Sequence, residues 1–252
     1  LRAKSIPTDR VIGKADEYFS RNDYAGAERH FLYWLEEANE GNDDRGAFVL
    51  YNELMGLYRK TGRKKEAFEC VDRAVELIKK LDIADTVSAG TAFVNAGTVY
   101  KAFGMAESAL PFFDRAVEIY ERELKDGDGR LGGLYNNKAL ALTDVKRFSA
   151  ARENYLKALR VMEKVKYGEL ERAITYLNLA DLAEAEYGAE NAEEEISRLL
   201  SEAEKLLNDP SVPQNGYYAF VCEKCASAFG YHGFFAFENE LKRRAEEIYE
   251  RA

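Results

Sequence analysis

Proline and cysteine are both scarce in this chain of 252 residues, which contains four prolines and three cysteines. Because proline interrupts helices, its scarcity favours long regular segments. Three cysteines cannot build the dense disulfide framework of a small secreted domain, and an odd number leaves at least one thiol free. The composition therefore predicts a reducing compartment, with the cytoplasm as the expected location.

Long apolar runs and an excess of positive charge are missing as well. No apolar stretch approaches the roughly 20 residues that span a bilayer, and residues 1–10 lack the order of a signal peptide. The chain starts with Leu1 rather than Met, which leaves room for an upstream segment. Its formal net charge of −9 repels phosphate backbones. We therefore expect neither a membrane nor a nucleic acid as its partner.

The chain does contain a pattern that recurs about every 42 residues. Five positions carry it, with steps of 40, 42, 42 and 41 residues between them: Tyr18, Tyr58, Tyr100, Leu142 and Ala183. A small or slender residue lies three positions before each of them, and alanine lies nine positions after the first four. Such a period indicates tandem units that bury their apolar faces against one another.

Residues 91–124 show the structure expected for one unit. Phe93, Ala96, Gly97 and Tyr100 fall at i, i+3, i+4 and i+7, which is one face of a helix, and Gly104 ends that helix. The same spacing follows in a second helix over residues 109–120. Small residues at the crossing let two helix backbones approach closely.

The pattern thus predicts an all-α fold, a right-handed superhelical array of antiparallel helix pairs forming a single solenoid domain over residues 1–252. Its six pairs are expected at approximately 8–47, 48–89, 90–131, 132–172, 173–215 and 216–252.

These motifs resemble the tetratricopeptide repeat, in which aromatic and small residues alternate in this order along two helices. The resemblance covers about residues 8–251. The long period, and segments such as 109–124 followed by 134–139, are similar to the long-repeat branch of kinesin light chains and many bacterial proteins. This resemblance implies a non-catalytic scaffold that binds a protein or an extended peptide in a concave groove. The alternative is a ligand- or peptide-sensing regulatory module of a larger signalling system, although no effector domain is recognisable.

One position of the first helix carries a polar residue in four successive units: Glu53, Asn95, Asn137 and Asn178. Asparagine is unfavourable in the middle of a helix, so its recurrence calls for a reason. An amide both donates and accepts hydrogen bonds and could hold a peptide backbone, and the resemblance implies this role for the three asparagines. The alternative is a ladder of amides between repeats that only stabilises the stack.

Other polar residues are expected on the same surface. Asn52, Arg59, Lys60 and Lys101 lie toward its N-terminal half, and Asn136, Thr143, Asp144, Asp181 and Glu184 lie toward its C-terminal half. This distribution predicts a dipolar groove that would orient a ligand with opposite charges at its ends. The alternative is ordinary solvated helix surface.

Cys222 and Cys225, with His232 nearby, are the one group that resembles a metal site. A zinc site normally needs a second Cys-x-x-Cys pair, so metal binding is the less favoured alternative to small residues packed in a core. We expect no cofactor and no enzymatic activity, because neither histidine has a recognisable nucleophile as its partner.

The two end units are rich in aromatic residues, including Trp34 in the first and Phe234, Phe235 and Phe237 in the last. A final helix over 238–251, with Leu241, Ala245 and Ile248 on one face, is expected to cover the last cluster. The chain is then a monomer. The alternative is a homodimer formed through an end unit.

Overall fold

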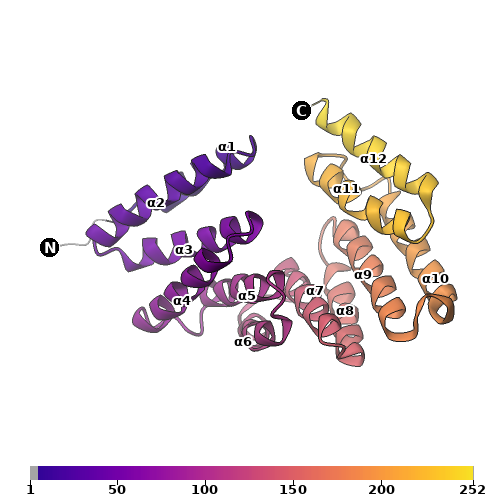
Figure 1. The fold of residues 1–252 in the computed structure, drawn as a ribbon, viewed down its shortest axis with the longest axis horizontal. Coiled ribbons are helices and arrows are strands. Elements are labelled where there is room, and N and C mark those ends of the chain that lie inside the picture. Colours follow the sequence, from indigo (N-terminus) through magenta and orange to yellow (C-terminus); the bar gives the residue numbers. More distant parts are fainter. Residues whose placement is uncertain (1–4, 252) are drawn as a thin grey trace. The chain divides into compact units, whose positions relative to one another are not determined.

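The computed structural model describes residues 5–251. Within this range the chain forms twelve α-helices and no strand (Figure 1). The helices are α1 (Thr8–Phe19), α2 (Tyr24–Glu40), α3 (Asp44–Lys60), α4 (Lys64–Lys80), α5 (Val87–Ala102), α6 (Ala106–Glu123), α7 (Gly129–Asp144), α8 (Phe148–Met162), α9 (Glu169–Tyr187), α10 (Ala189–Leu207), α11 (Gly216–Tyr231) and α12 (Phe235–Tyr249). They belong to two compact units, Leu1–Glu123 and Leu124–Ala252.

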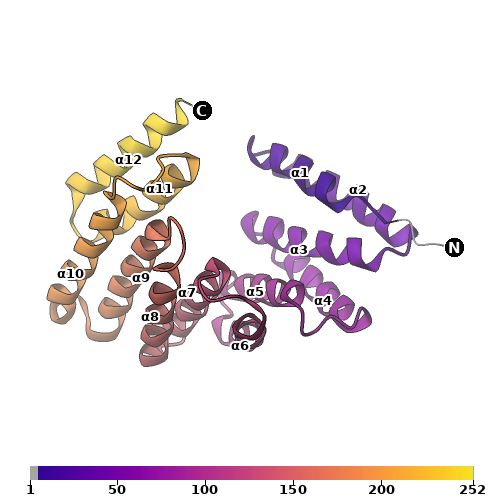
Figure 2. The ribbon, with the colours of Figure 1, turned by 180° about the vertical axis from the view of Figure 1, so that it is seen from behind.

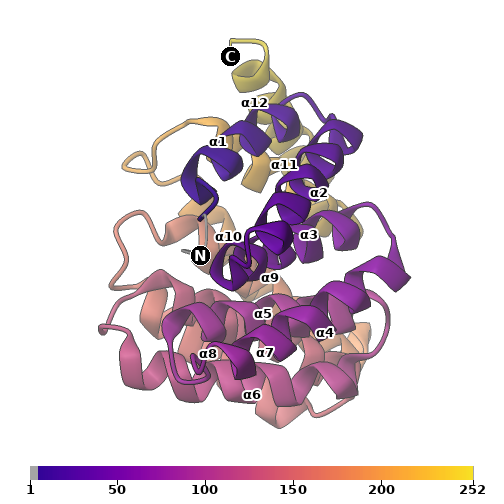
Figure 3. The same ribbon diagram turned by 90° about the vertical axis from the view of Figure 1, so that its left-hand side faces the viewer.

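Each odd-numbered helix packs against the helix that follows it, which gives six sequential antiparallel pairs. Within the first unit, α3 also lies against α2 and α5 (Figure 3). Within the second unit, α9 lies against α7, α8 and α11 (Figure 2). The predicted all-helical repeat array is therefore confirmed.

A left-handed backbone residue joins the two helices of every pair. These turn residues are Asn22, Gly62, Gly104, Lys146, Gly188 and Gly233, with φ between 56° and 85°. In the first four pairs, the N–H of the next residue donates to the carbonyl of the periodic Tyr18, Tyr58, Tyr100 or Leu142, at 2.8–2.9 Å. This is the bond that closes a helix C-terminus in a Schellman motif. The repeat in the sequence thus marks where each first helix ends.

Close helix crossings explain the small residues of the repeat. A Cβ atom added to Gly97 would lie 2.5 Å from the ring of Phe113 on the paired helix, so only glycine fits there. Ala74, Ala116 and Ala158 are at most 1% exposed at the equivalent crossing positions of the second helices. Trp34 takes this position in the first pair and is half-buried.

Helix caps shift the boundaries of the pairs from those expected. The pairs in the middle of the chain begin at Asp44, Val87, Gly129 and Glu169, three or four residues before the approximate starts at 48, 90, 132 and 173. At the first three of these starts, the side chain of the preceding residue accepts a hydrogen bond from a backbone N–H of the first turn. Such caps extend a helix beyond its apolar pattern.

The C-terminal aromatic cluster differs from the expected arrangement, because α12 begins at Phe235 rather than at residue 238. Phe237 packs edge-on against Phe229 of α11, with ring centroids 4.7 Å apart. Leu241 and Ala245 are buried as expected, whereas Phe235 remains 63% exposed. Helix α12 therefore covers part of the aromatic cluster, and Phe235 and Phe237 are themselves residues of α12.

None of the described helices combines the length and the apolar character needed to cross a bilayer.

Candidate binding surfaces of the first helices

The first unit contains a pocket of about 360 Å³ between α3, α5 and the linker that precedes α5. Arg45, Phe48, Val49, Asn52 and Glu53 line it from one face of α3. Leu81, Ile83 and Thr86 line it from the linker, and Ser88 and Thr91 from α5. The pocket thus has an apolar middle with an arginine at one end of its α3 wall and a glutamate at the other.

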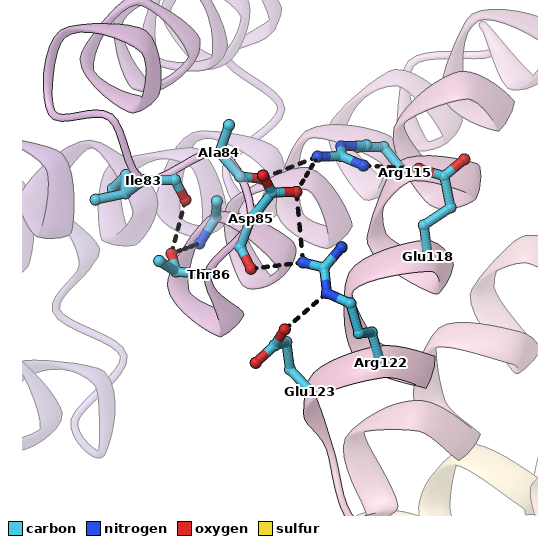
Figure 4. A network of polar contacts seen from close by, with 9 residues as sticks. Ile83, Ala84, Asp85, Thr86, Arg115, Glu118, Arg122 and Glu123 are labelled. Atoms are coloured by element: carbon cyan, nitrogen blue, oxygen red, sulfur yellow. Dashed lines mark hydrogen bonds and ion pairs between the residues drawn. The ribbon is translucent and has the colours of Figure 1, made fainter.

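Two arginines of α6 hold the linker in place (Figure 4). Arg115 donates to the carboxylate of Asp85 at 2.7 Å, and Arg122 donates to the Asp85 carbonyl at 2.9 Å. Thr86 donates to the carbonyl of Ile83 at 2.8 Å, which closes the turn that carries both pocket residues. These bonds fix one wall of the pocket before any ligand arrives.

An amide bridge joins α3 to α5 at Asn52, which lines this pocket. Asn95 Nδ2 donates to Asn52 Oδ1 at 3.3 Å, and Asn52 Nδ2 donates to the carbonyl of Phe48 at 2.9 Å. Of the amides expected to face a ligand, these two are therefore engaged with each other.

Glu53 is half-buried and has no hydrogen-bond or ion-pair partner among residues 5–251. Burial raises the pKa of its carboxyl, and the charge of Asp16 on α1 acts in the same direction. A carboxylate held in this environment is stabilised by any cation that reaches it.

Glu53 belongs to the polar row found in the sequence, whereas Arg45, Phe48 and the linker residues were missed there. Helical spacing from Glu53 back to Phe48 and Arg45 is the signal that could have identified the α3 wall.

The second unit has a pocket of about 310 Å³ between α9 and α11. Among its lining residues are Asn178 and Asp181 of α9 and Lys224, Ser227 and Tyr231 of α11. The structure thus brings together two of the predicted site residues, Asn178 and Asp181. It also adds an ammonium group and a phenol from the neighbouring first helix.

Asp181 and Tyr231 of this pocket also belong to a polar cluster with Glu184 and His232. His232 Nε2 lies 3.4 Å from Asp181 Oδ1, and His232 Nδ1 lies 3.9 Å from Glu184 Oε2. The Tyr231 hydroxyl donates to Glu184 Oε1 at 2.8 Å. These contacts tie the end of α11 to α9, while 58% of the Asp181 side chain remains exposed.

The remaining predicted amides of the second unit divide into two kinds. Asn136 Nδ2 donates to the hydroxyl of the fully buried Thr175 at 2.7 Å, which links α7 to α9. Asn137 and Asn178 are half-buried and make no hydrogen bond to another described residue. Their amides therefore take no part in the hydrogen bonds that join neighbouring repeats within residues 5–251.

The three predicted basic residues of the groove lie in the first unit, and Lys60, the last residue of α3, is exposed. Arg59 is exposed near the end of α3, and Lys101 is half-buried near the end of α5. None of the three lines the pocket of that unit, whose charged residues are Arg45 and Glu53.

The cysteines lie in the interior. Cys222 and Cys225 are at most 1% exposed on α11, and burial raises the pKa of Cys225 to about 12. A metal binds the thiolate, which this environment disfavours. Within residues 5–251, no three His, Cys, Asp or Glu side chains are arranged to hold a metal ion.

The repeat geometry agrees with the sequence comparisons. Sequence profiles of the tetratricopeptide repeat match residues 46–122 and 132–165, which hold most of α3–α6, most of α7 and all of α8. The chain is a tetratricopeptide repeat protein. No curated protein sequence matches this tetratricopeptide repeat protein.

Solved structures share its fold at low sequence identity. BtubC (BKLC) from P. vanneervenii is 20% identical with a TM-score of 0.69, over 81% of this chain and 83% of that one. A putative kinesin light chain with nearly identical TPR-like repeats from Podosopora anserina is 17% identical with a TM-score of 0.57, over 80% of this chain and 94% of that one. The predicted resemblance to the kinesin-light-chain type of repeat is confirmed for the fold.

Proposed function

We propose that this tetratricopeptide repeat protein is a non-catalytic scaffold that binds an extended peptide segment of a protein partner along its first helices. The main support is the free pair of amides in the second unit. Asn137 on α7 and Asn178 on α9 are half-buried, unpaired among the described residues, and carried by helices that pack against each other.

An extended peptide suits such amides because every one of its residues offers both an N–H and a C=O. Neighbouring helices lie about 8–10 Å apart and an extended chain advances about 3.3 Å per residue, so consecutive amides meet every third peptide residue. Contacts of this kind read the backbone and leave selectivity to the adjacent pockets.

The pocket beside Asn178 would supply part of that selectivity. Asp181 and Lys224 present opposite charges at its rim, and Ile174 and Leu177 provide apolar surface. We expect a polar or charged peptide side chain to lie there.

The three free thiols support a reducing compartment such as the cytoplasm, and we propose that the protein acts there as a monomer.

The test starts with random dodecapeptides displayed on phage, selected on the intact protein. Replacing both Asn137 and Asn178 by Ala should weaken the binding of the enriched peptides by about 1–3 kcal/mol, because each amide loses a net hydrogen bond of about 0.5–1.5 kcal/mol. Asn239→Ala, an exposed amide on α12, serves as the matched control. Fluorescence polarisation measures the affinities.

Thermal unfolding accompanies each affinity, because the proposal requires a loss of binding without a loss of stability. Unchanged affinity in the double Ala variant would contradict a role for these amides. If no peptide is enriched on the parent protein, peptide binding itself is wrong. A homodimer seen by light scattering across a concentration series would contradict the monomer.

A further inference from the structure

The pocket of the first unit carries an unpaired charge at each end of its α3 wall. Arg45 and Glu53 both line it, and neither has a partner among residues 5–251. Eight residues separate them, which corresponds to about 12 Å along a helix. The positions fall at i and i+8 with Phe48 and Val49 between them, so one face of α3 presents all four side chains.

The middle of the pocket is apolar. Phe48 is 6% exposed on α3, and Leu81 and Ile83 come from the linker that Arg115 and Arg122 hold in place. A wall fixed in advance loses little conformational entropy when a ligand binds, which favours affinity. An apolar ligand group placed there would also exclude water from the half-buried Glu53.

Of the two charges, that of Glu53 is the more costly to maintain without a partner. Burial and the like charge of Asp16, which is exposed on α1, both raise the pKa of its carboxyl. No lysine or arginine among the described residues offsets this cost. A ligand ammonium or guanidinium group would relieve both effects, and its aliphatic stem would lie against the apolar middle.

We infer that the α3–α5 pocket selects peptides carrying a lysine or arginine for Glu53, an apolar residue about two positions away, and an acidic residue for Arg45. This inference rests on the proposed function and adds the chemistry of the partner. The spacing follows from geometry, since about 12 Å corresponds to three or four residues of extended chain. A peptide running in either direction satisfies the same charges, so the signature is the set of residues and their spacing.

The test repeats the selection of random dodecapeptides on the parent protein and on Glu53→Lys. Parent-selected peptides should contain a basic residue three or four positions from an acidic one, with an apolar residue between. Glu53→Lys should lose the preference for the basic residue and select an acidic one instead. Enriched peptides without a basic preference on the parent overturn this inference while leaving the proposed function intact, whereas no enrichment at all overturns both.

Affinities of one synthetic peptide from the parent selection provide the second readout. Glu53→Gln, which keeps the size of the side chain, should weaken its binding about tenfold, as expected for loss of a partly desolvated charge partner. Glu36→Gln, an exposed carboxylate on α2, should leave the affinity unchanged. Equal affinities for the parent and Glu53→Gln overturn the inference even if Glu53→Lys is poorly folded.

The pH profile separates a charge contact from a steric one. A basic peptide favours ionised Glu53, so its affinity for the parent should fall as the pH drops through the raised pKa of that carboxyl. The decline should begin above the ordinary value of 4.5. Glu53→Gln should keep only the decline caused by protonation of the peptide's own acidic residue, which both proteins share. Parallel profiles for the two proteins would contradict an ion pair with Glu53.

Discussion

Asn95 Nδ2 donates a hydrogen bond to Asn52 Oδ1 at 3.3 Å, which joins α5 to α3 across two successive repeats. The asparagines of the first helices therefore do not form one uniform row. Asn52 and Asn95 are paired with each other, Asn136 is paired with Thr175, and Asn137 and Asn178 remain unpaired among the described residues. Some of these amides therefore join one repeat to another, while others remain candidates for ligand binding.

The bridge between Asn52 and Asn95 should contribute to stability. In a double-mutant cycle with Asn52→Ala and Asn95→Ala, we expect a coupling of about 0.5–1.5 kcal/mol in the free energy of unfolding, because the side chains share a hydrogen bond. Urea denaturation measures it. Asn52→Ala and Asn178→Ala, in different units, should be additive, and a coupling near zero for the bridged pair would contradict the bond.

Lys146 and Gly104 occupy equivalent turns with φ of 59° and 77°. A side chain in this conformation costs about 1–2 kcal/mol, so Lys146→Gly should stabilise the protein by about 0.5–1 kcal/mol after the flexibility of glycine is subtracted. Gly104→Ala should destabilise it by about 0.5–1 kcal/mol, which is the same balance with the opposite sign. The added Cβ would meet no other atom, so only the backbone conformation contributes. Thermal unfolding measures both. Lys79→Gly, within the last turn of α4, should have the opposite sign to Lys146→Gly.

Asp85 should make the stability of the first unit depend on pH. The hydrogen bond from Arg115, and secondarily the charges of Arg115 and Arg122, lower the pKa of its carboxyl below 3.8. Its contribution is therefore complete well above pH 3.8 and is lost as the pH falls through the lowered folded-state value. The melting temperature of Asp85→Asn should lie below that of the parent at neutral pH and converge with it at low pH.

Circular dichroism melting curves across this pH range measure the effect of Asp85→Asn. Asp72→Asn, at an exposed position of α4, is the matched control and should differ little from the parent. A difference between parent and Asp85→Asn that stays constant at all pH values would show that the ion pairs contribute nothing.

Ala116 marks the crossing of α6 with its partner helix and is fully buried. Ala116→Leu should destabilise the protein by about 1–3 kcal/mol, because extra methylene groups overpack the crossing. Ala102→Leu, at the exposed end of α5, adds the same atoms without this cost. Chemical denaturation compares the two variants, and equal stabilities would contradict the tight crossing.

The sequence alone determined the helices, their pairing and their type of repeat. These features depend on local spacing, since an apolar face recurs every three or four residues and a turn residue follows each periodic Tyr or Leu. For a related reason, the helices of the middle pairs begin three or four residues before the approximate pair boundaries taken from the repeat. The caps formed by Asp43, Thr86 and Asp128 depend on single polar side chains and leave no mark on the apolar pattern.

Only the tertiary structure decided which polar residues are available to a ligand. Asn95 and Asn137 occupy the same position of the repeat, and they differ because the partner of an amide lies on another helix about 40 residues away. The α3–α5 pocket could not be read from the repeat either. Its linker wall is held by Arg115 and Arg122, which lie 30 and 37 residues beyond Asp85 in the chain. The repeat pattern specifies the features that all repeats have in common. The candidate site depends on contacts that differ from one repeat to the next.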